Sequence, residues 1–333
     1  MWIHECRRVC ECMAGQERTG KSPARIVSIA EYSSSCLMPD NPCPKVFVLV
    51  PVHNRREITR KFMSCLQVQT HPRLQLILVD DGSTDGTDSM VREEMPDAEV
   101  LKGNGNLWWS GCMQLAFRNL LQLAPDSEDM ILLANDDIEF APDFIAKAVA
   151  ALHQKPDALL GARQIDRATN KVLETGVFAD LRRFVFRIAE SAEQINCLPT
   201  RALLVRWKDM KRIGGFHPHL LPHYLADYEY TLRATRRGLR CFTTPDVTII
   251  ADLGATGDHD LDEMVGSLLL RRLFSIKTPL NPVYRTTFVL LASPGLWKLI
   301  NLLHVWLRAF FRIFWQGLLC RPFPRKTALR VSS

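Results

Sequence analysis

A short apolar run that ends in acidic residues constrains the fold of this chain more than any other stretch. Residues 130–134 are Met-Ile-Leu-Leu-Ala, and Asn135, Asp136 and Asp137 follow directly. Because the run is apolar without alternation, it predicts a strand that is buried on both faces, as in a parallel sheet covered by helices. Polar groups at the carboxyl end of such a strand lie where open α/β sheets bind their ligands.

The two adjacent carboxylates at this strand end repel each other unless a positive charge balances them. A divalent cation held by oxygen ligands and by the phosphates of a substrate would supply that charge. The alternative is that Asp136 and Asp137 only cap a helix that begins near Pro142. These residues alone leave both interpretations open.

The rest of the central region alternates between apolar strands and helices joined by short loops. Strands are predicted at residues 45–52, 74–79, 99–102, 158–164, 172–176, 200–207 and 240–250, and helices after Arg55, at 87–94, up to Leu123, before Gly214 and at 227–238. This order predicts a doubly wound α/β domain over residues 44–260, with a mostly parallel central sheet flanked by helices. Neither the dinucleotide-binding glycine spacing nor a Gly-Lys-Ser/Thr phosphate loop occurs in it.

The first 43 residues show no periodic apolar pattern, so a loosely ordered segment is predicted there, with the functional protein starting near Met38. No charged start followed by an apolar stretch marks a signal peptide. The ten cysteines are scattered without paired Cys-x-x-Cys units, which argues against a disulfide framework and a zinc site. A reducing, cytoplasmic compartment is therefore expected.

The C-terminal segment, residues 261–333, is basic and is predicted to be helical. Residues 264–333 hold eleven Lys or Arg and no Asp or Glu. A narrow polar stripe with helical spacing runs down a surface of Leu, Ile, Trp and Phe, and consists of Lys298, Asn301, His304, Arg308, Arg312 and Gln316. Such a helix either packs into the core or lies in a membrane interface, and the aromatic residues beside basic ones favour the interface. A span over 288–307 is disfavoured by Pro294, Gly295 and Lys298.

Five motifs together resemble one family. They are Pro51-Val-His-Asn-Arg55, Asp80-Asp-Gly-Ser-Thr-Asp85, Gly103-Asn-Gly-Asn-Leu-Trp-Trp109, Asn135-Asp-Asp137 and Asp227-Tyr-Glu-Tyr-Thr-Leu-Arg233. Their order and spacing resemble family-2 glycosyltransferases with the GT-A fold, over roughly residues 45–260. The third motif resembles bacterial rhamnosyltransferases of surface-polysaccharide assembly.

The resemblance implies a specific activity and set of partners. The enzyme would move a sugar, with inversion, from a nucleotide-diphosphate sugar to a hydroxyl of a glycan or lipid-linked saccharide. The donor would be dTDP-rhamnose or a UDP-sugar. The basic C-terminal helix would attach the protein peripherally to the inner face of the cell membrane.

On the donor side, the resemblance implies that Asp81 contacts the pyrimidine base and that Pro51 and Asn54 line the same pocket. A carboxylate can accept the ring N–H of uracil or thymine. Asp80 and Asp85 are expected to be turn and cap residues only.

For the diphosphate, Asp137 resembles the carboxylate that binds Mg²⁺ or Mn²⁺, with Asp136 nearer the ribose or supporting the metal. Asn135 stands where a strict Asp-x-Asp motif has its first aspartate, which leaves the identity of the metal open.

On the acceptor side, Asp227 resembles the general base that takes the proton of the attacking hydroxyl. Glu229 would orient the acceptor or substitute as the base, unless both carboxylates only favour the start of their helix. Trp108 and Trp109 would form a stacking platform for sugar or base, or else belong to the core. His223 is a candidate donor to phosphate or acceptor, and His259 is expected to be a loop histidine, since its surroundings match the family poorly.

Two other classes of function compete with transfer. A carboxylate-pair glycoside hydrolase would use two acidic sites but would leave the residues after the first two strands unexplained. A non-catalytic protein that binds membranes or nucleic acid would use the basic tail, but no nucleic-acid module occurs, so no nucleic acid is expected as a partner. The residues favour a transferase.

Overall fold

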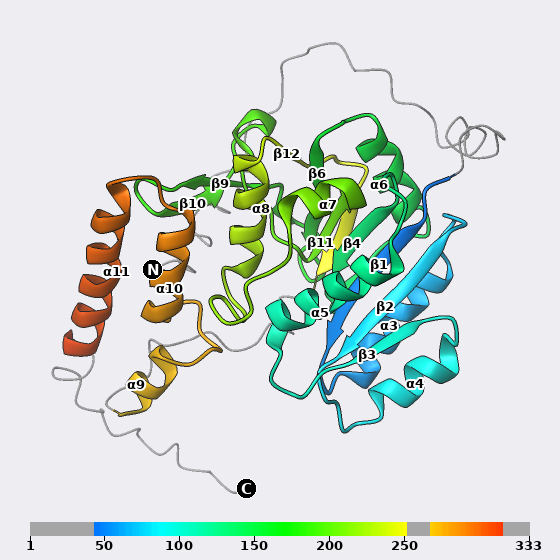
Figure 1. The fold of residues 1–333 in the computed structure, drawn as a ribbon, viewed down its shortest axis with the longest axis horizontal. Helices are drawn as coiled ribbons and strands as arrows, with labels where there is room; N and C mark the ends of the chain where they lie inside the picture. Colours follow the sequence, from blue (N-terminus) through cyan, green and yellow to red (C-terminus); the bar gives the residue numbers. More distant parts are fainter. Residues whose placement is uncertain (1–42, 252–266, 316–333) are drawn as a thin grey trace, which may run out of the picture.

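The computed structural model describes residues 43–251 and 267–315 (Figure 1). Seven strands form the central sheet in the order β12-β6-β11-β4-β1-β2-β3. Their bounds are Val46–Val52 (β1), Leu74–Asp80 (β2), Glu99–Lys102 (β3), Met130–Ala134 (β4), Ala158–Gly161 (β6), Ala202–Arg206 (β11) and Arg240–Phe242 (β12). β11 is antiparallel to β4 and β6, and the other neighbouring pairs are parallel. The predicted mostly parallel α/β fold is confirmed.

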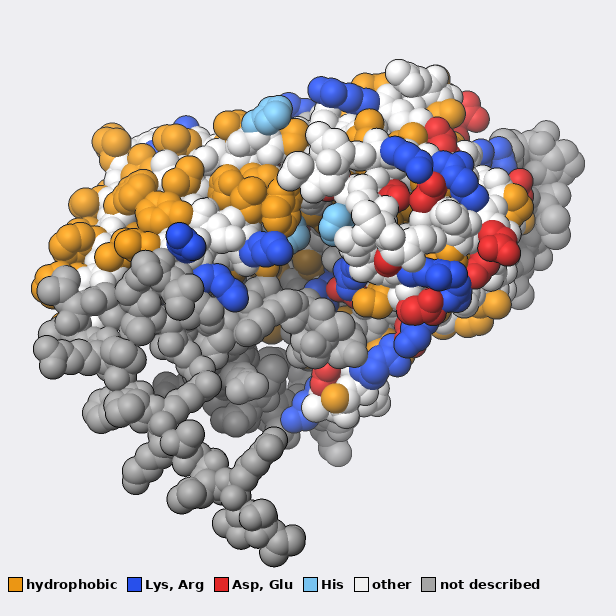
Figure 2. Space-filling model, turned by 90° about the horizontal axis from the view of Figure 1, so that it is seen from below, with side chains coloured by type: hydrophobic (Ala, Val, Ile, Leu, Met, Phe, Trp, Pro, Cys, Tyr) orange, Lys and Arg blue, Asp and Glu red, His pale blue; other side chains and the backbone are white. Residues whose placement is uncertain are grey.

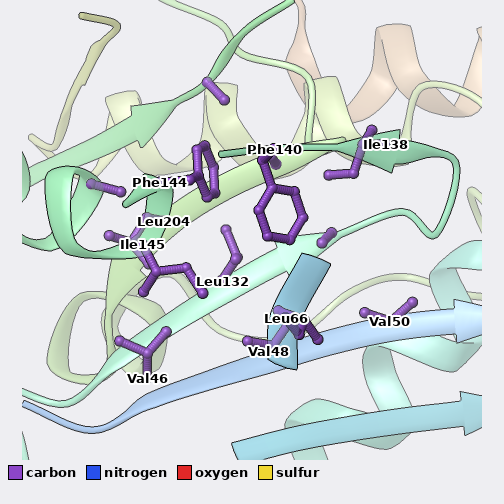
Figure 3. Packing of buried hydrophobic residues seen from close by; sticks show 14 of the residues in the cluster. Val46, Val48, Val50, Leu66, Leu132, Ile138, Phe140, Phe144, Ile145 and Leu204 are labelled. Carbon is purple, nitrogen blue, oxygen red and sulfur yellow. The ribbon is translucent and has the colours of Figure 1, made fainter. Parts of the chain in front are cut away.

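Helices cover both faces of this sheet because alternate residues of its apolar strands point to opposite sides. One face carries α3 (Arg56–Gln67), α4 (Thr87–Glu94) and α6 (Phe144–His153). The other carries α5 (Trp108–Leu123), α7 (Trp207–Ile213) and α8 (Ala226–Arg236). Figure 3 shows the first core, in which Val48 and Leu132 of neighbouring strands meet Leu66 and Phe140. All five residues of β4 are buried, as the sequence predicts.

A second sheet has the order β5-β13-β7-β8, with β5 at Ile138–Glu139, β7 at Arg163–Asp166, β8 at Val172–Glu174 and β13 at Thr248–Ala251. The predicted single strand 158–164 is wrong, because the chain changes sheets after Gly161. The change in burial pattern marks the break, since β6 is buried throughout whereas β7 alternates. The short hairpin of β9 (Val177–Asp180) and β10 (Val185–Ile188) and the 3-10 turn Ala192–Gln194 were not predicted.

Three C-terminal helices follow: α9 (Ser267–Leu273), α10 (Pro282–Ala292) and α11 (Trp297–Phe314). α10 packs beside α8 and against α11. Pro282 opens α10 and the Asn281 carboxamide caps it, accepting the Val283 N–H at 2.9 Å. α10 and α11 form an antiparallel hairpin, since Asn301 Nδ2 bonds Ser293 Oγ at 3.1 Å and Trp306 Nε1 bonds Thr286 Oγ1 at 3.0 Å.

Within the described ranges, no helix combines the length and apolar character that a membrane crossing requires. The helical structure is interrupted between α10 and α11, at Pro294 and Gly295, two of the residues that argue against a membrane span in the sequence. Met38, the segment up to residue 42, His259 and the boundary near residue 260 lie outside the described residues.

Candidate active site

Three neighbouring parallel strands bring the predicted motifs to one edge of the sheet. β1 lies between β2 and β4, with Val52 opposite Asp80 and Leu49 opposite Leu133. The loops that follow these strands, residues 53–55, 81–86 and 135–137, therefore share the edge where α/β sheets bind ligands.

The loops after β1 and β2 are tied together by Asn54. Its backbone is left-handed, with φ 51°, which asparagine tolerates better than most residues. The Asn54 Oδ1 accepts the Thr84 N–H at 2.7 Å, and the Asn54 N–H donates to Ser83 Oγ at 2.9 Å. His53 Nδ1 lies 2.6 Å from the Asp81 carbonyl oxygen. Asn54 thus holds the two loops of the predicted base pocket, while Pro51 lies half-buried in β1 beside them.

Asp80 and Asp85, the first and last residues of the second motif, stabilise the turn and the start of the next helix, as predicted. Asp80 Oδ1 accepts the Ser83 N–H at 2.8 Å. Asp85 accepts the Arg56 N–H at 3.0 Å and the Thr87 N–H at 3.1 Å, so it caps the start of α4. Its hydrogen bond from the Thr87 hydroxyl holds the pKa of Asp85 below its usual range.

Asp81 organises the glycine-rich loop. Its buried carboxylate accepts three backbone N–H groups, from Gly105 at 2.8 Å, Leu107 at 2.9 Å and Trp108 at 3.0 Å. Gly103 packs so closely that a Cβ there would lie 2.5 Å from Asp81 Oδ1. Because a carboxylate has about four lone-pair sites, these bonds leave about one for another donor. The contact of Asp81 with a base stays a prediction, and its contact with the loop is an additional role.

The acidic pair after β4 lies against Arg55. The Arg55 guanidinium is 3.0 Å from Asp136 Oδ1 and 3.5 Å from Asp137 Oδ2. The Thr59 hydroxyl of α3 donates to Asp136 Oδ2 at 2.9 Å. Burial raises the pKa of Asp136 to about 6, although Arg55 and Thr59 oppose the shift. Neither aspartate caps α6, where the Ile145 N–H of the first turn donates to Gln69 Oε1 at 3.0 Å.

Asn135, directly before this pair, contacts α5 and the residue before β11. Its side-chain oxygen accepts the Trp109 indole N–H at 3.2 Å, and its own N–H donates to the Arg201 carbonyl at 3.0 Å. The Arg201 charge in turn favours the ionised form of Asp227, but burial is stronger and raises the pKa of Asp227 to about 6. Asp227 is half-buried as a residue, and among the described residues its carboxylate accepts only the Tyr228 N–H, at 2.8 Å.

The two tryptophans play different parts. Trp109 packs edge-on against Phe216, with ring centroids 5.4 Å apart, and belongs to the core. The Trp108 ring lies 5.9 Å from the His223 ring and 6.0 Å from Lys277 Nζ, so aromatic and basic groups from three segments surround it. Figure 2 shows a hollow between the apolar C-terminal part and the charged opposite part, with histidine side chains at its edge.

Glu229 has no place in this arrangement. Residues two apart on a helix do not share a face, so Glu229 points away from the side that presents Asp227. Its buried carboxylate is held by Arg233, with Nε–Oε1 at 3.0 Å and Nη2–Oε2 at 2.9 Å. Arg233 also donates to the Ile213 carbonyl, which links α8 to the end of α7. We therefore assign Glu229 to the packing of α8 rather than to catalysis.

Comparison with known proteins identifies the family. The sequence profile described as "Glycosyl transferase family 2" matches residues 47–197. An N-acetylglucosaminyl-diphospho-decaprenol L-rhamnosyltransferase of Mycobacterium tuberculosis (strain ATCC 25618 / H37Rv) is 23% identical over 220 residues, covering 57% of this chain and 70% of the relative. Residues 47–197 are a family-2 glycosyltransferase domain. Enzymes of this family take their sugar from nucleotide-sugar donors.

Solved structures of low sequence identity share the fold of this transferase. The mannosyltransferase PcManGT from Pyrobaculum calidifontis, in complex with GDP-Man and Mn²⁺, superposes with a TM-score of 0.51 at 19% identity, covering 85% of this chain and 81% of that one. S. aureus TarS 1–349 superposes with a TM-score of 0.52 at 16% identity, covering 81% and 74%. These similarities support the GT-A architecture.

Three residues of the site were not singled out from the sequence. Arg55 pairs with both aspartates, Thr59 holds Asp136, and Arg201 links Asn135 to Asp227. Thr59 stands one turn after Arg55 on the buried face of α3, so a polar residue at an apolar helix position was the available signal. Arg201 had no such signal, because its partners are distant in sequence.

The acidic pair of the transferase suits a divalent cation. Asp137 Oδ1 is buried without a hydrogen-bond partner among the described residues, and Asp136 Oδ1 is buried with only the ion pair to Arg55. Mg²⁺-like cations use one or two carboxylates and complete their shell with water and substrate phosphates. The same ranges contain no cluster of three acidic, His or Cys ligands.

Proposed function

We propose that this transferase moves a hexose, with inversion, from a nucleotide-diphosphate sugar to a hydroxyl of a glycan or lipid-linked saccharide. The observation that carries the proposal is that burial raises the pKa of Asp227 to about 6, with Arg201 close enough to Asp227 for its charge to oppose the shift and with the Arg201 carbonyl bonded to the N–H of Asn135, next to the acidic pair. A carboxylate with such a pKa is ionised at neutral pH and is a stronger base than an ordinary aspartate.

In the proposed reaction, Asp227 accepts the proton of the acceptor hydroxyl. The oxygen of the acceptor hydroxyl attacks the anomeric carbon of the donor sugar while the bond between that carbon and the diphosphate oxygen breaks. The anomeric centre is therefore inverted, and a nucleoside diphosphate leaves. The ordered Tyr228 N–H holds one oxygen of Asp227 and leaves the other for the proton. No protein nucleophile is needed.

The acidic pair would hold a Mg²⁺ or Mn²⁺ ion, through Asp137 with Asp136 in support. When bound, the ion would offset negative charge on the departing diphosphate. The positively charged Arg55 guanidinium lies beside the same two carboxylates and reduces the repulsion between them.

Two observations support a deoxy-sugar donor such as dTDP-rhamnose. The loop from Gly103 to Trp109 resembles that of rhamnosyltransferases, and Asp81 fixes its shape through three hydrogen bonds. The M. tuberculosis relative is also named as an L-rhamnosyltransferase. A UDP-sugar is the alternative donor.

The test is a panel of nucleotide sugars offered to the purified enzyme with and without EDTA. We expect one donor to be consumed with release of its nucleoside diphosphate, loss of turnover with EDTA and recovery with Mn²⁺ or Mg²⁺. NMR of the product should show the anomeric configuration opposite to that of the donor. Retention of configuration, or cleavage of a glycan without any nucleotide sugar, would contradict the proposal.

A further inference from the structure

The orientation of α11 is the reverse of that expected for a helix on the surface of a soluble protein. Its buried side chains are Asn301, Val305 and Ala309, and Asn301 bonds the Leu181 carbonyl at 2.9 Å. The solvent side is instead apolar: Leu303 is 62% exposed and Phe310 is 59% exposed. The polar stripe therefore lies partly against the protein body, and the Leu, Ile, Trp and Phe faces point outward.

The apolar surface extends over the neighbouring helices. Large apolar side chains are exposed on all three C-terminal helices, and we call this set the apolar face: Leu270, Phe274, Val283, Leu290, Leu296, Trp297, Leu299, Ile300, Leu303, Trp306, Leu307, Phe310, Phe311, Phe314 and Trp315. Figure 2 shows apolar side chains gathered over this end of the molecule. Soluble proteins rarely expose apolar patches this extensive unless they bind a partner or a membrane.

A group of cations lies within the hairpin. The Arg285 guanidinium lies over the Phe184 ring at 5.3 Å, and its Nε is buried without a hydrogen-bond partner in the described part of the chain. Burial lowers the pKa of Arg285 to about 10, with contributions from Arg308 and Arg312. The same two effects lower the pKa of His304, through burial first and then Arg308 and Arg285. The α10–α11 hairpin thus brings like charges together.

This charge has no acidic counterpart on its own segment. From residue 264 to residue 333 the chain carries only basic charges, and the hairpin lies within that range. Two copies joined through the apolar face would bring their basic clusters together, which like-charge repulsion opposes. A bilayer that carries anionic phospholipids offers both apolar chains and phosphates.

We propose that the α10–α11 hairpin docks on an anionic lipid bilayer, with the apolar face in the interface and with the exposed Arg308 binding lipid phosphate. The proposal does not depend on the reaction that the enzyme performs. It places Lys277 near the docked hairpin, because Lys277 lies in the connection between α9 and α10, where its Nζ is 6.0 Å from the Trp108 ring.

The test is co-sedimentation of the full chain with vesicles of phosphatidylcholine alone or of phosphatidylcholine mixed with phosphatidylglycerol. We expect the chain to pellet with the mixed vesicles. Leu303→Gln combined with Phe310→Gln should weaken that binding by about tenfold or more, because two exposed apolar anchors are lost. Arg308→Gln should weaken binding to the mixed vesicles by roughly fivefold and leave phosphatidylcholine binding unchanged.

The matched control is Leu121→Gln combined with Arg118→Gln on α5, since both positions are exposed on a helix outside the apolar face. The control should bind as the native chain does, and all variants should keep the native melting temperature because the replaced side chains are exposed. A native chain that stays in the supernatant with mixed vesicles would overturn the proposal. A Leu303/Phe310 variant that binds the vesicles normally would also overturn it. So would a variant that keeps vesicle binding but changes from a dimer to a monomer in solution, because the apolar face would then be an interface between two copies.

Discussion

Replacing Asp227 by asparagine should abolish transfer and stabilise the fold at the same time. Asn keeps an oxygen for the Tyr228 N–H but cannot take a proton from the acceptor, so we expect kcat to fall on the order of 10²- to 10⁴-fold. Donor binding should change little, because Asp227 lies on α8 and not among the loops after β1 and β2.

The stability gain follows from the pKa of Asp227, which rises from 3.8 to about 6 on folding. A raised carboxyl pKa means that the folded state disfavours the charged form. The resulting destabilisation is absent below about pH 4, grows as the pH rises toward 6 and is complete above it. The shift corresponds to roughly 3 kcal/mol at pH 8, which Asp227→Asn would remove.

The assay combines turnover at pH 8 with thermal melts at pH 4 and pH 8. The Asn variant should melt higher than the native enzyme at pH 8 and at nearly the same temperature at pH 4. The contrasting variant is Glu229→Gln, which leaves the buried Arg233 charge without its partner and should cost about 3–5 kcal/mol while the folded enzyme keeps its turnover. Near-normal turnover of Asp227→Asn, or loss of turnover in a folded Glu229→Gln enzyme, would refute the assignment of the base.

Four further predictions concern the groups of the site. The profile of kcat/KM against pH should fall on its acid side with an apparent pKa near 6, because Asp227 and Asp136 both gain protons there; a fall centred near pH 4 would contradict the burial argument. Asp81→Asn should raise the KM for the donor and lower the unfolding free energy by about 1–3 kcal/mol, measured by urea titration, because an amide oxygen cannot hold all three loop N–H groups. Gly103→Ala should have the same two effects without removing a charge, because its Cβ would lie 2.5 Å from Asp81 Oδ1; an unchanged KM would show that the loop does not shape the donor pocket. Thr59→Val should raise the pKa of Asp136 further, since the hydroxyl that favours its charged form is lost, and NMR titration of that carboxyl would measure the shift.

The central sheet and the edge that carries the site could be predicted from local patterns. The apolar runs at β1, β2 and β4 require burial on both faces, and parallel strands place their following residues at one edge. The motifs within those loops then placed Asn54, Asp81, Asp136 and Asp137 together. The short strands β5, β9 and β10 were missed because two to four residues carry too little periodic signal.

The roles of individual carboxylates required the tertiary structure. Asp227 and Glu229 are equivalent in sequence, as two acidic residues in the first turn of α8, but helix geometry turns them to different sides and only Glu229 meets Arg233. Asp81 acquires its three N–H donors from a loop more than twenty residues away.

Helix periodicity in α11 showed a polar stripe and an apolar remainder, but not which side faces the protein. That choice depends on the packing of Asn301 and Val305 against elements distant in sequence. The sequence by itself determined which strands must be buried and where their polar ends lie, because burial of apolar runs is a local requirement. Only the tertiary structure decided which side chains meet and which surface stays open, because those contacts join segments that the sequence separates.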